Sequence, residues 1–153
     1  MTTQVNIKAL INVQRKAQQD EPFPSLEVRA SRIKRLIGML ASNEQKICDA
    51  LMADFGNRPH ITTQMAEILG TISTLKYALD NIEKWLQPNL RNTPPPAGPA
   101  GAVSEVQYMP LGSVGVISPW NLPINLSFGA MGAIFAAGNR IVLKPSEVTE
   151  NTS

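Results

Sequence analysis

Gly115 to Glu147 reads GVISPWNLPINLSFGAMGAIFAAGNRIVLKPSE, and this stretch decides the fold. The apolar, β-prone run Val114 to Ser118 leads directly into Pro-Trp-Asn-Leu-Pro, which is typical of a short strand followed by a turn. The apolar segment 124–137 is closed by Gly138-Asn139, as expected of a buried helix. Arg140 to Leu143 then forms a second short strand, which ends in Lys-Pro-Ser-Glu. The stretch therefore predicts a strand, a helix and a second strand.

Both motifs in this stretch follow the carboxyl end of a predicted strand. In open α/β sheets, ligands bind in the crevice outside those ends. The sequence therefore places the Asn121 amide, the Trp120 indole, the Lys144 ammonium and the Glu147 carboxylate around one crevice. We expect a ligand site there.

Composition and charge narrow the function classes. A chain of 153 residues usually forms one domain, and a net charge of +2 does not by itself indicate a nucleic-acid partner. Of the 14 lysines and arginines, only Arg140 and Lys144 follow residue 100, so the C-terminal third is expected to be interior. The single cysteine, Cys48, excludes an internal disulfide framework. Without a visible secretory signal at the start, this composition predicts a cytoplasmic protein.

Residues 106–139 carry no formal charge and could be mistaken for a membrane span. Pro110, Pro119 and Pro123 interrupt the run. The helical part is about 21 Å long at 1.5 Å per residue, whereas a span needs roughly 30 Å. The run therefore predicts buried core and no membrane segment.

The first ninety residues show helical periodicity. A helix over Thr3 to Gln19 is expected to stop at the prolines of 21–24, and Ser25 is a good N-cap for the next helix. Ser42, with Gln45 three positions later, matches a capping box that would start a third helix, and Gly56 would end it. A longer helix is predicted over 62–86, packing on its own domain rather than in a coiled coil. The expected apolar positions are Leu26, Ala30, Ile33, Ile37, Leu40, Ile68, Ile72, Leu75, Leu79, Ile82 and Leu86.

The composition changes abruptly in the proline-rich segment 92–99, which predicts an extended, semi-rigid linker. The alternation over 103–109 then suggests a half-exposed strand. The predicted organisation is a helical segment over 1–92, a linker with a strand over 93–110, and the start of a dinucleotide-binding domain over 111–153. The predicted fold class is α/β.

Several other motifs carry little functional information. Asp54-Phe55-Gly56 matches a kinase triplet, but no glycine-rich phosphate loop accompanies it, so it predicts a helix end with a glycine cap. Cys48 lies mid-helix without a nearby histidine, which predicts a buried structural thiol. His60 is the only histidine, so no metal site is expected. The basic set Arg29, Arg32, Lys34 and Arg35 is interpreted as a solvated helix face.

Three strings together resemble the aldehyde dehydrogenase superfamily: PLGSVGVI at 110–117, SPWNLP at 118–123 and AAGNRIVLKPSE at 136–147. Lys-Pro-Ser-Glu alone is a weak signal. Its spacing makes the combination specific, because Lys144 follows Asn121 by 23 residues. The lead-in string ADFGNR at 53–58 resembles the branch that contains coniferyl aldehyde and fatty aldehyde dehydrogenases.

The resemblance implies a role for each motif residue. In the family, a cysteine thiolate attacks the aldehyde, the thiohemiacetal passes hydride to the nicotinamide, and the asparagine of Pro-Trp-Asn donates an N–H to the oxyanion. Asn121 is thus the expected catalytic oxyanion donor. Lys144 and Glu147 would hydrogen-bond the adenosine ribose hydroxyls of the cofactor. The residues expected to bind NAD or NADP are Ser118, Pro119, Trp120, Lys144, Ser146 and Glu147. In the structural alternative, Asn121 merely caps the next helix and Lys144 is a surface strand end.

The family's nucleophile lies in a Gly-Gln-x-Cys context and its base in Glu-Leu-Gly-Gly, and neither string occurs here. We therefore expect these 153 residues alone not to oxidise aldehydes. The branch implies an aromatic aldehyde such as coniferyl aldehyde, or a long aliphatic one, and a homodimer at full length. Two alternatives stay open. One is a non-catalytic truncated paralogue or assembly module that pairs with a full-length subunit. The other is a helical interaction protein that uses the seam 68–86 or the basic face around Arg32.

Overall fold

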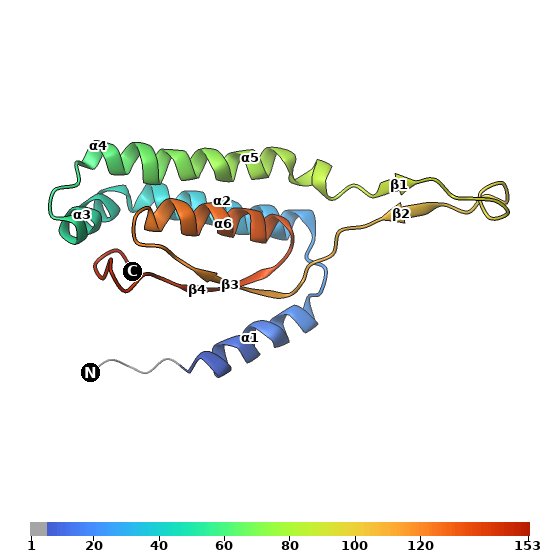
Figure 1. The fold of residues 1–153 in the computed structure, drawn as a ribbon, viewed down its shortest axis with the longest axis horizontal. Helices are drawn as coiled ribbons and strands as arrows, with labels where there is room; N and C mark the ends of the chain where they lie inside the picture. Colours follow the sequence, from blue (N-terminus) through green and yellow to red (C-terminus); the bar gives the residue numbers. More distant parts are fainter. Residues whose placement is uncertain (1–5) are drawn as a thin grey trace.

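The computed structural model describes residues 6–153, which form three layers (Figure 1). A group of helices lies on one side of a small parallel sheet, and the first helix lies against the sheet's other side. A β-hairpin projects from one end. The elements are α1 (Ile7–Asp20), α2 (Leu26–Ser42), α3 (Glu44–Phe55), α4 (His60–Thr62), the π-helix η1 (Thr63–Leu69), α5 (Gly70–Trp85), β1 (Asn89–Arg91), β2 (Ser104–Val106), β3 (Ser113–Ile117), α6 (Pro123–Ala136) and β4 (Arg140–Lys144).

The predicted strand, helix and strand are confirmed as β3, α6 and β4, each within about one residue of its predicted start. The two strands pair in parallel, with Ser113 opposite Arg140 and Ile117 opposite Lys144. The pairing continues past the strand, because the Ser118 N–H donates to the Lys144 carbonyl at 2.9 Å. Both carboxyl ends therefore lie at one edge, and the α/β class is confirmed.

The hydrophobic core lies among α2, α5 and α6, which pack on one another. The predicted seam faces this core: Ile68, Leu75 and Ile82 are at most 3% exposed. Gly132 on α6 permits the close approach of α5, since a Cβ there would lie 2.5 Å from Leu75 Cδ2. The apolar run around α6 is therefore protein core. Among residues 6–153, no helix has the length and hydrophobicity needed to cross a bilayer.

Two helix predictions in the first ninety residues were wrong in detail. Ser42 is not an N-cap: it is the last residue of α2, and α3 begins at Glu44 after Asn43, without a side-chain cap. Asn43 instead ends α2, because its Nδ2 donates to the Met39 carbonyl at 2.8 Å. The predicted helix over 62–86 begins as a wider π-helix, η1, before it becomes α5.

Other helix boundaries agree with the prediction. Ser25 caps α2 by accepting from Val28 N, and Gly56 ends α3 with φ of 74°. The first helix is described from Ile7, where Asn6 accepts from Ala9 N at 3.1 Å, and its predicted start at Thr3 lies outside the described residues.

Arg29 does not lie on a solvated face, which corrects the interpretation of the basic set. Its side chain is buried, and it donates from Nε to the Pro24 carbonyl at 2.8 Å and from Nη1 to the Ala136 carbonyl at 3.1 Å. The guanidinium thus satisfies a carbonyl at the C-terminus of α6. Arg32 is half-buried and pairs with Glu21 at 2.8 Å, while Lys34 and Arg35 are exposed as predicted.

The proline-rich segment is the tip of a hairpin rather than an extended linker. Asn89–Arg91 pairs antiparallel with Ser104–Val106, so the chain returns on itself. Turns close the tip, with Gly98 N donating to the Pro94 carbonyl at 3.2 Å and Ala102 N to the Ala97 carbonyl at 3.0 Å. The strand predicted over 103–109 is confirmed only over its first half, and its partner β1 was missed. The division into segments at 92 and 110 stays a prediction.

Asp54, near the end of α3, fixes the C-terminal turn. One carboxylate oxygen accepts from the Asn151 main chain at 2.9 Å and from its side chain at 2.8 Å. The other accepts from the Thr152 main chain at 2.9 Å and from its hydroxyl at 2.6 Å. Burial acts to raise the pKa of Asp54, but these hydrogen bonds together hold it below its usual value. The segment after Lys-Pro-Ser-Glu is therefore tied to the helical layer.

Gly138→Ala is expected to destabilise the protein by about 1–3 kcal/mol, because a side chain is strained at its φ of 84°. A Cβ would also lie 2.7 Å from Arg29 Cζ and 2.8 Å from Pro110 Cγ. The matched control is Gly38→Ala, in the exposed face of α2 with no atom within 4 Å of the new methyl. It is expected to stabilise by roughly 0.5–1 kcal/mol. Equilibrium denaturation of both variants measures the difference, and equal effects would contradict it.

Asp54→Asn is expected to cost roughly 1–2 kcal/mol at neutral pH, because one oxygen that accepts two hydrogen bonds becomes an NH2 group. Since the folded-state pKa is lowered, the carboxylate contribution is complete above the unfolded pKa and is lost as pH falls through the folded value. The difference between wild type and variant, measured by denaturation, should therefore be constant above about pH 5 and shrink below about pH 4. A difference that grows on acidification would contradict this assignment.

Candidate functional site

The candidate site lies at the edge where β3 and β4 both end. The loop 118–122 leaves β3 and leads into α6, while Lys144 is the last residue of β4. Because Ile117 pairs with Lys144, the Pro-Trp-Asn and Lys-Pro-Ser-Glu motifs begin side by side. The structure thus brings together the two motifs that the sequence analysis assigned to one crevice.

Trp120 is exposed over 54% of its surface, and one side of its ring contacts the end of α3. Its ring packs against Phe55 with 6.3 Å between centroids. The Arg58 guanidinium lies over the Phe55 ring, 4.8 Å from the ring centroid. Pro119 is half-buried beside it. The end of α3 therefore supports the Pro-Trp-Asn loop while leaving indole surface open.

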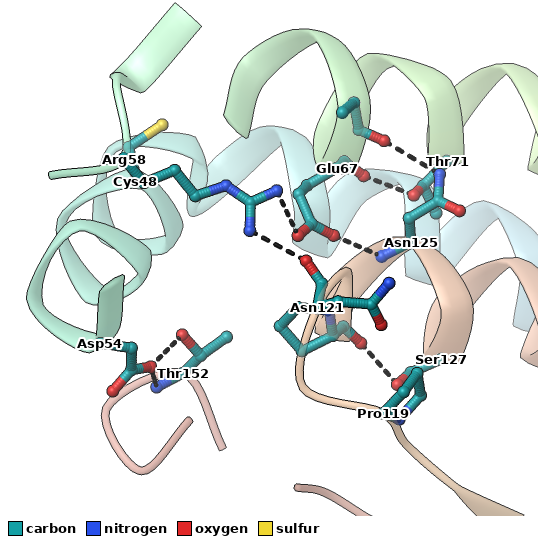
Figure 2. Close-up of polar contacts among 12 residues, drawn as sticks. Cys48, Asp54, Arg58, Glu67, Thr71, Pro119, Asn121, Asn125, Ser127 and Thr152 are labelled. Carbon is teal, nitrogen blue, oxygen red and sulfur yellow. Dashed lines mark hydrogen bonds and ion pairs between the residues drawn. The ribbon is translucent and has the colours of Figure 1, made fainter. Parts of the chain in front are cut away.

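Asn121 is exposed, and its backbone rather than its side chain is fixed. The Asn121 carbonyl accepts from Arg58 Nη1 at 3.1 Å, and Figure 2 shows the side-chain amide directed away from this contact. No hydrogen bond of that amide is found within residues 6–153. The alternative in which Asn121 caps the next helix is wrong, because α6 begins after Leu122 without any side-chain cap. The amide is therefore available to a ligand.

A buried carboxylate lies behind this loop and was not identified from the sequence. Glu67, in the π-helix η1, has no exposed surface. Its Oε1 lies 3.0 Å from Arg58 Nη2, and its Oε2 accepts from the Asn125 main chain at 2.8 Å (Figure 2). Burial raises the pKa of the Glu67 carboxyl, and the hydrogen bonds from Asn125 and Arg58 oppose that rise. The only sequence signal was an acidic residue next to the apolar position Ile68.

Ser118 and Ser146 are each only 6% exposed. The Ser118 hydroxyl is 2.6 Å from the Ser127 hydroxyl, and the Ser146 hydroxyl accepts from Val148 N at 3.3 Å. Both hydroxyls are thus used within the protein, where they fix the loop after β3 and the turn after β4. A direct contact of either serine with a cofactor stays a prediction.

Lys144 and Glu147 form an exposed ion pair just beyond β4. The hydrogen bond from Lys144 holds the pKa of the Glu147 carboxyl below its usual value, so this group is an anion at neutral pH. An ammonium donor next to a carboxylate acceptor can bind a pair of neighbouring hydroxyl groups. Because both groups lie in solvent, a ligand can reach them without unfolding any element.

A cavity of about 330 Å³ between α1 and the sheet includes Lys144 in its lining. A cleft of about 430 Å³ lies behind the strand ends, lined among others by Ser118, Leu143 and Pro145. A larger one of about 950 Å³ lies at the base of the hairpin, far along α6. The Asn121 amide and the Lys144–Glu147 pair therefore lie on an open edge of the structure.

Cys48 takes no part in this site. Its side chain is 1% exposed, and burial raises the pKa of the thiol, which makes thiolate formation unfavourable. The interpretation of Cys48 as a buried structural thiol is confirmed. Within residues 6–153, no three histidine, cysteine or acidic side chains gather in a way that could hold a metal ion.

Comparisons with known proteins agree with the motifs. Coniferyl aldehyde dehydrogenase of Pseudomonas sp. strain HR199 is 46% identical over 139 residues, which are 91% of this chain and 28% of that protein. A probable coniferyl aldehyde dehydrogenase of Caulobacter vibrioides is 43% identical over 85% of this chain and 27% of its own length. The chain thus spans less than a third of the relatives it matches.

Solved structures show the same architecture. The substrate-bound Staphylococcus aureus AldH superposes with a TM-score of 0.84 at 28% identity, over 97% of this chain and 32% of that one. PnpE in complex with nicotinamide adenine dinucleotide superposes with a TM-score of 0.81 at 22% identity, over 96% and 29%, and shows the fold alone. The family model described as "Aldehyde dehydrogenase family" matches residues 1–153, the whole chain. With the motifs, the fold and these relatives in agreement, the chain belongs to the aldehyde dehydrogenase family.

Proposed function

We propose that residues 1–153 are the N-terminal portion of an NAD(P)-dependent enzyme that oxidises an aldehyde to the carboxylic acid. In this proposal the chain supplies the oxyanion donor and part of the cofactor site, whereas the nucleophilic cysteine and the general base lie outside it. The observation that carries the proposal is the Asn121 amide, which is free at the strand edge while its own backbone is held by Arg58. Family membership supplies the reaction class.

The role of Asn121 follows from charge development. When a thiolate adds to an aldehyde carbonyl, negative charge grows on the oxygen, and a neutral N–H donor already in place stabilises that oxygen without reorganising. An aspartate in the same position would put one anion against another. The exposed amide of Asn121 has no internal hydrogen bond to give up among residues 6–153, so it can donate fully to the oxyanion.

The residues at the β4 end fit the adenosine portion of NAD(P). Lys144 offers N–H donors and Glu147 offers acceptors, and both are exposed at the carboxyl edge of the sheet. The bound cofactor supplies the hydride acceptor. Trp120, Pro119 and the backbone at Ser118 would form one wall of its crevice. The choice between NAD and NADP stays open: a rigid Glu147 carboxylate would repel a 2′-phosphate, whereas an exposed, mobile one could swing away.

The substrate class is proposed from the relatives. Two of them, at 46% and 43% identity, are described as coniferyl and probable coniferyl aldehyde dehydrogenases. An aromatic aldehyde of this kind, or a long aliphatic one, is therefore the first to assay. A homodimer in the cytoplasm remains the expected state of the complete protein.

Asn121→Ala is expected to lower kcat by about 10²–10³-fold, equal to roughly 2.7–4 kcal/mol of transition-state stabilisation. The assay follows nicotinamide reduction by absorbance, with coniferyl aldehyde and NAD+, in the complete protein that contains residues 1–153. Asn12→Ala on the exposed face of α1 is the matched control and should leave kcat unchanged. If Asn121→Ala turns over at the wild-type rate, its role as oxyanion donor is wrong.

Glu147→Gln tests the cofactor assignment. The variant keeps an acceptor oxygen but loses the negative charge, so KM for NAD+ should rise several-fold while KM for NADP+ falls relative to it. Steady-state kinetics with both cofactors measure this change in preference. The control is Glu150→Gln, an exposed acidic residue three positions beyond. An unchanged ratio of the two KM values would argue against contact between Glu147 and the ribose.

A further inference from the structure

The Arg58 guanidinium contacts three groups: the Asn121 carbonyl, the Glu67 carboxylate and the Phe55 ring. One nitrogen donates to the Asn121 carbonyl at 3.1 Å, another lies 3.0 Å from the Glu67 carboxylate, and its flat face covers Phe55 (Figure 2). The side chain of Arg58 is only 10% exposed. A guanidinium is planar and presents its donors in a fixed fork, so the position of Glu67 determines where the second nitrogen points.

Glu67 is fixed in turn by the start of α6. Its second oxygen accepts from the Asn125 main chain at 2.8 Å, which satisfies one of the free N–H groups of the first turn. The Asn125 side chain returns to the same π-helix and donates to the Ala66 carbonyl at 3.0 Å. A fully buried carboxylate needs such partners, because an unpaired charge in the interior is strongly unfavourable.

We infer that the Glu67–Arg58 ion pair is a positioning unit for the oxyanion donor, an inference that rests on the proposed function. The pair holds the C-terminal end of the Pro-Trp-Asn loop and the first turn of α6: Arg58 binds the carbonyl of residue 121, and Glu67 binds the N–H of residue 125. The backbone that carries Asn121 is thereby fixed at two points four residues apart. The amide itself stays outside the network and free to donate.

Fixing the backbone matters because catalytic hydrogen bonds tolerate little displacement. A shift of about 1 Å in a reacting group can cost on the order of 10²-fold in rate. Arg58 contacts the Asn121 main chain and not its amide, and Glu67 is fully buried, so we infer that both act through Asn121. If the ion pair contributed only to overall stability, its folded variants would still hold the Asn121 amide in place. The hydrogen bond from that amide to the oxyanion would then be as effective as in the wild type.

A double-mutant cycle on kcat separates these two roles. The complete protein is prepared as wild type, Glu67→Gln, Arg58→Lys and Asn121→Ala, and as each pair variant with Asn121→Ala. Lys keeps the positive charge of Arg58 but cannot bridge two acceptors with a rigid fork. Glu67→Gln and Arg58→Lys should each lower kcat by about 10–100-fold with KM for NAD+ changed less than about threefold. In the Asn121→Ala background the same changes should lower kcat by less than about threefold, because the positioned amide is gone.

Glu21→Gln is the matched control, since it removes a carboxylate that pairs with Arg32 at 2.8 Å far from the Pro-Trp-Asn loop. It should leave kcat within about twofold of wild type. If Glu67→Gln does not fold, the cycle of Arg58→Lys with Asn121→Ala decides alone. Thermal denaturation of every variant accompanies the kinetics, so that lost protein is not counted as lost rate.

Independent effects would overturn the inference: if the kcat losses of Glu67→Gln or Arg58→Lys multiply with that of Asn121→Ala, the ion pair does not act through Asn121. If Asn121→Ala keeps full turnover, or the wild type oxidises no aldehyde, the proposed function itself fails and the positioning role fails with it. The two failures are distinguishable, because only the first leaves Asn121→Ala impaired.

Discussion

The parallel pairing of β3 with β4 is the constraint on which the site depends. Because Ile117 lies opposite Lys144, the chain leaves both strands at the same edge, and residues 27 positions apart in the sequence pair there. The crossover helix α6 makes this possible, since parallel neighbours need a long connection. α6 in turn needs α2 and α5 to bury its apolar surface. Helices α2 and α5 are therefore required for the geometry of the strand edge.

Local patterns were sufficient to predict the elements that carry the motifs. The β-prone run predicted at 114–118, the closing Gly138 and the N-cap Ser25 each depend on nearby residues only, and each is confirmed, the strand with a shift of one residue. The capping box at Ser42 failed because a competing local interaction, from the Asn43 side chain to Met39, ends α2 there. The capping box at Ser42 and the hydrogen-bonding side chain of Asn43 are adjacent, and the local sequence pattern does not indicate which of them determines the helix boundary.

Long-range pairing was beyond the sequence patterns. Arg29 looked like part of a basic surface, but its partner at 3.1 Å is the Ala136 carbonyl, 107 residues away. Glu67 gave no sign of burial, since its partner Arg58 lies in the loop between α3 and α4 and its partner Asn125 lies in α6. The pairing of the hairpin was missed for a similar reason: its first strand, β1, has only three residues and too little alternation to be detected, and the prolines at the tip resemble a linker.

The polar residues of this edge fall into two groups: those that are buried with internal hydrogen-bond partners and those that are exposed to solvent. The hydroxyls of Ser118 and Ser146 and the carboxylate of Glu67 are buried and have internal partners. The Asn121 amide is exposed without a hydrogen-bond partner among residues 6–153, and Lys144 and Glu147 are exposed as an ion pair whose two groups also face water. Residues of the first kind can fix a loop, and residues of the second kind can exchange water for a ligand. Because the buried set holds the backbone that carries the exposed set, binding a ligand at this edge need not disturb the core.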